Sequence, residues 1–269
     1  MAQSIDELIE RAWDALDDED FDEAEALGRR ALMVDPSSVD ARIGVARALI
    51  NKEDYRDALP LLREAAALAS DDAEIRTDLG IALFENCEFA EAGEELELAL
   101  RMGADSPDAY YWMGLCLERK GQYKGADEHF ARAHRMDSEG YPLPARISRK
   151  ACLDAVEEAR ARLPEQFDRL LENVAIRVED LPPESILKEF DPPMDPCLLG
   201  LFVGIPLAEK STADTTPRLP DTVLIFQRNL ERSCEDRETL VDEIFTTLYH
   251  EIGHYLGFDE DELAERGFA

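Results

Sequence analysis

The N-terminal half of the chain repeats itself every 34 residues, and this period restricts the possible folds more than any other feature. Aromatic residues recur at this step: Phe21, Tyr55, Phe89 and Tyr123. Two columns of alanine keep it as well, namely Ala24, Ala58, Ala92 and Ala126, then Ala31, Ala65, Ala99 and Ala133. A fixed period of this length is the signature of structural repeats that stack on one another.

Each repeat contains two helical patterns separated by a polar turn, which predicts helical hairpins. Small residues let the two helices approach closely, and the aromatic at the turn fills the space where they diverge. The pattern resembles the tetratricopeptide repeat, whose Leu-Gly pair appears at Leu79-Gly80 and more loosely at Met113-Gly114. Residues 5–138 hold about four such repeats, and the first two depart from the family at this pair. The resemblance implies an all-α right-handed superhelix.

That resemblance also implies a concave face, lined by the first helices, that binds a peptide or another protein segment. By the family's register, the candidate contact residues on this face are Ile43, Arg47, Thr77, Phe84 and Tyr111, together with Ile9, Trp13, Ile50, Ile81 and Leu115. The face is more apolar than a groove built to clamp a carboxylate. Two interpretations stay open, because it either takes an external ligand or packs against the second half of the chain.

Charge excludes several classes of partner. The chain has 29 Lys+Arg and 61 Asp+Glu among 269 residues, a formal net charge of −32, and no basic stripe. Nucleic acid and anionic membranes are therefore not expected partners. No apolar segment approaches the roughly 18 residues of a membrane span, and the N-terminus lacks the pattern of a signal peptide. Five scattered cysteines without a C-x-x-C pair favour a reducing, cytoplasmic location.

The 34-residue period stops near Ser138, where proline and glycine predict a domain boundary. We expect a repeat domain over residues 1–140 and a small α+β domain over residues 141–269. Its predicted helices lie near 147–162, near 164–171 and from about 237 to 256, where Gly257 ends the last one. Its predicted strands are 174–178, 198–203 and 222–226, and a loop over 209–220 joins the last two.

The last helix contains the pattern H-E-x-x-H, from His250 to His254. Residues four apart share a helical face, so both imidazoles can bind one zinc ion while Glu251 reaches a water molecule. The predicted chemistry is hydrolysis, in which Glu251 is the general base and later protonates the leaving amine. The other histidines, His129 and His134, are five residues apart and share a face poorly, so we expect no metal there.

A third zinc ligand is expected soon after the motif. In the longer pattern H-E-x-x-H-x-x-G-x-x-H, the last position is Glu260 in this chain, and a carboxylate is an acceptable zinc ligand. Other assignments stay open because the neighbourhood is acidic: Asp261, Asp259, Glu262, Glu265 or no protein ligand at all. A solvated acidic loop is the competing explanation for this cluster.

Residues from about 151 to 269 resemble the zincin-type metallopeptidases described as minimal matrix-metalloprotease-like domains. The resemblance rests on the segments 163–167, 171–175, 199–207, 219–221 and 250–257, with Leu263. It implies a compact α+β fold, one zinc ion bound by His250, His254 and an acidic third ligand, and peptidase activity. It also implies that the strand 222–226 lies at the edge of the cleft and pairs with an extended peptide.

The chain departs from true metzincins in two ways. No methionine follows the motif, since the last one is Met194, and no later Tyr or His is placed to stabilise an oxyanion. Tyr249 and Tyr255 are expected to be packing residues. Two hypotheses follow. In the first, the protein is a zinc peptidase whose repeats bind a protein partner or substrate. In the alternative it is a protein-binding adaptor, in which the zincin half has little or no turnover and holds metal structurally.

Overall fold

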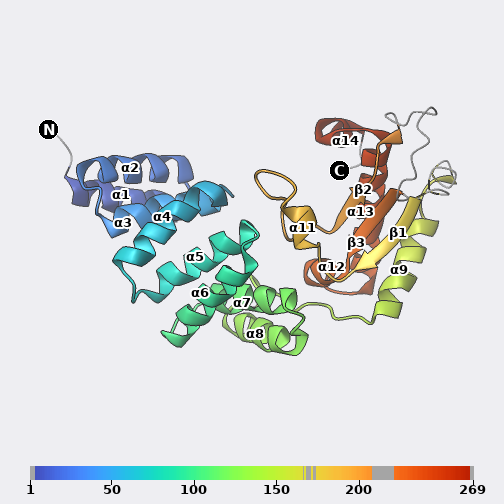
Figure 1. Cartoon of the computed structure of the whole chain (residues 1–269), viewed down its shortest axis with the longest axis horizontal. Coiled ribbons are helices and arrows are strands. Elements are labelled where there is room, and N and C mark those ends of the chain that lie inside the picture. The colour runs from blue at the N-terminus through green and yellow to red at the C-terminus, as the bar shows by residue number, and fades with distance from the viewer. Residues whose placement is uncertain (1–3, 166, 168–170, 172–173, 208–220, 267–269) are drawn as a thin grey trace. The chain divides into compact units, whose positions relative to one another are not determined.

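The chain forms two compact units (Figure 1). The computed structural model describes residues 4–165, 167, 171, 174–207 and 221–266. The first unit combines residues 1–141 with residues 187–196, and the second combines residues 142–186 with residues 197–269. Among the described residues, no helix has the length and apolar character needed to cross a bilayer.

The first unit is built from consecutive pairs of antiparallel helices, the blue to green part of Figure 1. Its helices are α1 (Ile5–Asp17), α2 (Phe21–Val34), α3 (Val39–Asn51), α4 (Tyr55–Leu68), α5 (Ala73–Glu85), α6 (Phe89–Arg101), α7 (Pro107–Arg119) and α8 (Tyr123–Met136). The four periodic aromatics are therefore the first residues of the second helices, α2, α4, α6 and α8. This confirms the predicted superhelix of helical hairpins.

The periodic small residues lie at the contact between the two helices of each pair. All eight alanines of the two columns are completely buried. A Cβ atom on Gly80 would lie 2.5 Å from Cγ of Leu96, and one on Gly114 would lie 2.6 Å from Cε1 of Phe130. Such distances leave no room for a side chain, so glycine is required where these helices approach.

A segment from the middle of the C-terminal sequence belongs to the first unit. The side chain of Leu187 is fully buried, and Arg119 Nη2 donates to the carbonyl of Pro196 at 2.8 Å. Further contacts of the segment 187–196 with the repeats are Cys87 Sγ to the Met194 carbonyl at 3.6 Å, Arg56 with Asp191 at 2.7 Å and Lys188 with Glu88 at 3.4 Å. The repeat unit therefore includes ten residues that lie between two strands of the second unit in sequence.

The second unit mixes helices and strands. Its elements are α9 (Arg149–Ala161), β1 (Val174–Glu179), α11 (Glu184–Leu187, whose last residue belongs to the first unit), β2 (Gly200–Val203), β3 (Asp221–Phe226), α12 (Gln227–Ser233), α13 (Arg237–Leu256) and α14 (Glu260–Arg266). The helix predicted near 147–162, the three strands and the long helix are confirmed. The helix predicted near 164–171 lies partly, and the loop over 209–220 wholly, outside the described residues.

In the described part of the chain, the strands form one sheet with the order β1-β3-β2. Strand β3 pairs in parallel with β1, Val174 opposite Asp221, and antiparallel with β2, Gly200 opposite Ile225. The expectation that 222–226 pairs with an extended peptide is therefore wrong, because β3 is central and pairs with β1 on one side and β2 on the other. The physical reason is burial on both faces, since Val223, Leu224, Ile225 and Phe226 are all buried.

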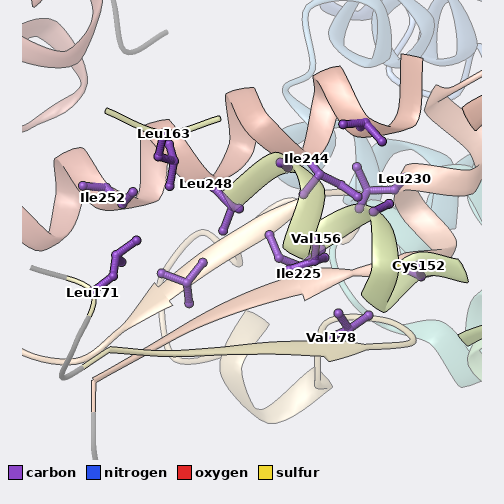
Figure 2. Packing of buried hydrophobic residues seen from close by; sticks show 14 of the residues in the cluster. Cys152, Val156, Leu163, Leu171, Val178, Ile225, Leu230, Ile244, Leu248 and Ile252 are labelled. Carbon is purple, nitrogen blue, oxygen red and sulfur yellow. The ribbon is translucent and has the colours of Figure 1, made fainter. Parts of the chain in front are cut away.

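The core of the second unit lies between the sheet and two helices. Cys152 and Val156 of α9 and Ile244, Leu248 and Ile252 of α13 belong to one buried cluster with the strand residues Val178 and Ile225. Figure 2 shows these side chains meeting in the layer between the helices and the strands. Packing against this layer fixes the position of α13 and of the motif that it carries.

Candidate metal centre

Helix α13 has clear signals at both ends. Asp236 is its N-cap, and a capping box joins its carboxylate to Thr239 N and the Thr239 side chain to Asp236 N. Gly257 ends the helix with φ 95°, in the left-handed region that glycine adopts without strain. The predicted role of Gly257 as the residue that stops the helix is confirmed. His250 and His254 thus lie in the last two turns of a helix that is fixed at both ends.

The two motif imidazoles face each other. Their Nε2 atoms are 3.0 Å apart, and the rings meet nearly edge to face. His254 Nδ1 lies 3.2 Å from the carbonyl oxygen of Phe258, just after the helix. Because a carbonyl only accepts hydrogen bonds, this contact favours the tautomer of His254 with its proton on Nδ1. A neutral ring then has its lone pair on Nε2, which is the tautomer that binds a metal.

This pair of nitrogens fits a zinc ion. Two Zn–N bonds of about 2.05 Å at a tetrahedral angle place the nitrogens about 3.3 Å apart. The separation of 3.0 Å in this structure is close to that value. The contact of His254 Nδ1 with the Phe258 carbonyl is of the kind that orients an imidazole in metal sites.

Glu251 is buried beside this pair and tied to strand β2. Its side chain is 6% exposed, and Oε2 accepts a hydrogen bond from Phe202 N at 2.6 Å. The Leu199 carbonyl accepts from Phe226 N, so alternation along β2 places the Phe202 N–H on the other edge, away from β3. Glu251 therefore reaches the outer edge of β2.

Glycine is required where β2 approaches α13. A Cβ atom on Gly200 would lie 2.4 Å from Thr247 Cγ2 and 3.1 Å from the Leu224 carbonyl. Next to this contact is a cavity of about 280 Å³, lined by Leu198, Leu199, Gly200, Glu243, Thr246, Thr247, His250 and Glu251. The cavity opens beside the general base predicted from the sequence and one predicted zinc ligand.

The acidic residues after the motif have different positions. Asp259 and Glu262 form a capping box at the start of α14, with Glu262 N on the Asp259 carboxylate at 2.9 Å and Asp259 N on the Glu262 carboxylate at 3.2 Å. Asp261 is exposed. Glu260 is the first residue of α14, and its side chain, like that of Glu265, lies outside the described residues. Among the described residues, no third His, Cys, Asp or Glu joins the two histidines.

The tyrosines of the motif helix pack against other side chains or are buried, and the two histidines outside the motif contact backbone carbonyls. Tyr249 stacks on Phe245, with ring centres 5.9 Å apart, and Tyr255 is 4% exposed. The Nδ1 atom of His129 lies 2.9 Å from the backbone carbonyl oxygen of Gly125. The Nδ1 atom of His134 lies 3.0 Å from that of Tyr141.

A groove of about 440 Å³ lies on the repeat unit, among α3, α5 and α7. Of the candidate contact residues, Arg47, Ile50, Thr77 and Ile81 line it. Ile43 and Phe84 are buried, and Tyr111 packs against Trp112, Phe130 and Tyr141. Sequence reasoning missed Asp78, Asp108 and Trp112, which also line the groove. Each lies on a first helix, but a helical pattern does not show which residues of a face surround a hollow.

Comparison with known families assigns both halves of the chain. Residues 171–268 match the zincin-like metallopeptidase family. Tetratricopeptide repeat families match residues 9–73, 49–115 and 107–139. The chain therefore carries tetratricopeptide repeats followed by a zincin-like metallopeptidase domain.

Solved structures similar to the chain include several of MamA. MamA from Desulfovibrio magneticus RS-1 is 21% identical, with a TM-score of 0.45, over 51% of this chain and 77% of that chain. A structure titled MamA MSR-1 C2 is 20% identical, with a TM-score of 0.43, over 51% of this chain and 79% of that chain. No curated protein matches the chain.

Proposed function

We propose that the second unit is a zinc-dependent peptidase and that the repeat unit binds its protein substrate or a protein partner. The observation that carries the proposal is the pair of Nε2 atoms 3.0 Å apart beside the buried carboxylate of Glu251. The match of residues 171–268 to a metallopeptidase family supports it. In this proposal His250 and His254 are zinc ligands, and Glu260 is the third, by its spacing in the motif.

A zinc ion held there supplies Lewis-acid chemistry, which polarises a peptide carbonyl and makes water more acidic. Glu251 is the group that accepts a proton from water and returns it to the leaving amine. The hydrogen bond from Phe202 N holds its carboxylate at the edge of β2, so the base does not have to be ordered during the reaction. Because Glu251 is buried, bulk water does not compete with the reacting water molecule for its carboxylate.

Strand β2 and the adjacent cavity are placed to position a substrate. In the described sheet β2 has a neighbour only on the β3 side, so an extended peptide can lie along the part of its outer edge that the bond between Phe202 N and Glu251 leaves open. The cavity of about 280 Å³ lies between β2 and the turn of α13 that precedes His250, and it is large enough for one side chain. This arrangement brings a bound peptide next to Glu251.

The adaptor hypothesis has its own supporting observation. Because the Glu251 carboxylate joins α13 to β2, it has a structural role even in a protein without turnover. Glutamine and alanine at this position separate the two hypotheses. Glutamine keeps an oxygen that accepts from Phe202 N but has no basic carboxylate, whereas alanine loses both.

The test is a comparison of wild type, Glu251→Gln and Glu251→Ala, each loaded with zinc. Zinc content is measured by elemental analysis, and cleavage by mass spectrometry of a proteome-derived peptide library. We expect zinc in all three, a loss of cleavage of about 10²-fold or more in both variants, and reduced stability in Glu251→Ala alone. Equal cleavage by wild type and Glu251→Gln would overturn the peptidase proposal. Bound zinc with no cleavage by the wild type or by either variant would support the adaptor hypothesis.

A further inference from the structure

The groove on the repeat unit carries an excess of negative charge. Three carboxylates line it, from Glu74, Asp78 and Asp108, against one guanidinium, from Arg47. Arg47 is already paired, with Nε on Asp78 at 2.7 Å and Nη2 on Glu74 at 3.2 Å. Asp108 accepts a hydrogen bond from the phenol of Tyr141, and in the described part of the chain no cation pairs with it.

The electrostatics of the groove agree with this excess. Burial raises the pKa of Asp78, and although Arg47 opposes the shift, the charges of Asp108 and Glu74 add to it. A cation placed near Asp78 and Asp108 would remove this repulsion. A ligand carboxylate or phosphate would increase it.

The walls of the groove suit a long side chain that ends in a positive charge. Ile81 and Trp112 form apolar surface next to the carboxylates. Trp112 is held by edge contacts with Phe84 and Tyr111, at ring-centre distances of 5.4 Å and 6.1 Å. An arginine or lysine can lay its aliphatic stem against this surface, keep its charge at Asp108, and stack on the indole face.

We propose that this groove binds a protein segment through an arginine or lysine side chain, which inserts between Trp112 and the carboxylate of Asp108. The inference rests on the proposed role of the repeat unit in binding protein, and it names the chemical class of that partner. The volume of about 440 Å³ accommodates one such side chain and its neighbours on an extended peptide.

A matched pair of variants tests the role of Asp108. Asp108 is the second residue of α7 after the N-cap Ser106, and Asp40 is the second residue of α3 after the N-cap Ser38. Asp108→Asn and Asp40→Asn therefore make the same change at the same helix position, one in the groove and one on an exposed face. Asparagine also keeps an oxygen that accepts the hydrogen bond from Tyr141.

The probe is a library of blocked peptides in which each sequence has four versions, with arginine, lysine, glutamine or glutamate at its centre. Binding is measured by fluorescence anisotropy to the full chain carrying Glu251→Gln, so that peptides stay intact. We expect the arginine and lysine versions to bind about tenfold more tightly than the glutamine versions. Asp108→Asn should remove most of this preference, and Asp40→Asn should leave it unchanged.

Three results would overturn the inference: no peptide binds, the glutamine or glutamate versions bind as well as the cationic ones, or both asparagine variants have the same effect. None of these results bears on cleavage by the second unit, which the Glu251 comparison decides separately. A failure of the groove and a failure of the peptidase proposal are therefore distinguishable.

Discussion

The backbone N–H of Phe202 donates a hydrogen bond to the carboxylate of Glu251 at 2.6 Å, which connects strand β2 directly to the motif helix. The strand and the helix are far apart in sequence, and this bond spans 49 residues. The position of the general base proposed here therefore depends on how closely β2 approaches α13. Variants that change this approach should change activity without removing a zinc ligand.

Gly200→Ala should displace β2 from α13, because the new Cβ atom would lie 2.4 Å from Thr247 Cγ2. Overpacking of this kind costs about 1–3 kcal/mol of stability. Thr247→Ser removes Cγ2, so the double variant should recover part of the loss, limited by the Leu224 carbonyl at 3.1 Å. The measurements are denaturant unfolding and Glu251-dependent cleavage, with zinc content as the control. Equal losses in the single and double variants would contradict this explanation.

Removal of zinc should destabilise the second unit only. A ligand that binds only the folded state stabilises it by about 4 kcal/mol at a thousand times its Kd. Both tryptophans of the chain, Trp13 and Trp112, belong to the repeat unit, so their fluorescence reports on that unit alone. We expect a chelator to lower the melting temperature seen by circular dichroism and to leave the tryptophan transition unchanged. A double variant, His250→Ala with His254→Ala, should show no response to the chelator.

The stability of the repeat unit should fall as pH rises, because of Glu85. Burial raises the pKa of Glu85 to about 8, and the charges of Asp195 and Glu53 add to the shift while Arg119 opposes it. The folded state therefore binds this proton more tightly than the unfolded state, whose pKa is near the ordinary 4.5. The stabilisation is complete below pH 4.5 and is lost as pH rises through 8, by up to about 1.4 kcal/mol per pH unit.

Glu85→Gln tests this prediction, since glutamine is neutral at every pH. Unfolding in urea, followed by tryptophan fluorescence from pH 5.5 to pH 8.5, should show a steeper decline for wild type than for Glu85→Gln. Glu97→Gln removes one carboxylate from the exposed side of α6 and should keep the wild-type slope. Parallel slopes for wild type and Glu85→Gln would show that this carboxyl group does not cause the decline.

Local signals predicted most of the elements. The 34-residue period located the repeat helices, because each buried alanine or aromatic packs within its own hairpin or the next one. Capping residues and Gly257 located α13, because these act within one or two turns. The candidate ligands His250 and His254 and the base Glu251 were found for the same reason, since all three lie on that single helix.

Features that depend on distant partners were not predicted. The central place of the strand 222–226 in the sheet was not predicted, although the unbroken apolar run from Val223 to Phe226 is typical of a central strand. The bond between Glu251 and Phe202 has no sequence signal, because nothing local to either residue indicates the other. Asp108 and Trp112 were not recognised as groove residues, because a helical pattern shows which residues share a face but not which ones surround a hollow.

The segment 187–196 has a practical consequence for dissecting this protein. A fragment that ends at residue 140 contains all the repeat helices but lacks the buried Leu187 and the Pro196 carbonyl that accepts the hydrogen bond from Arg119. Such a fragment is an incomplete folding unit rather than an isolated module. A chimera that joins the second half of this chain to the repeats of another protein would also separate the segment 187–196 from the repeat helices that it contacts.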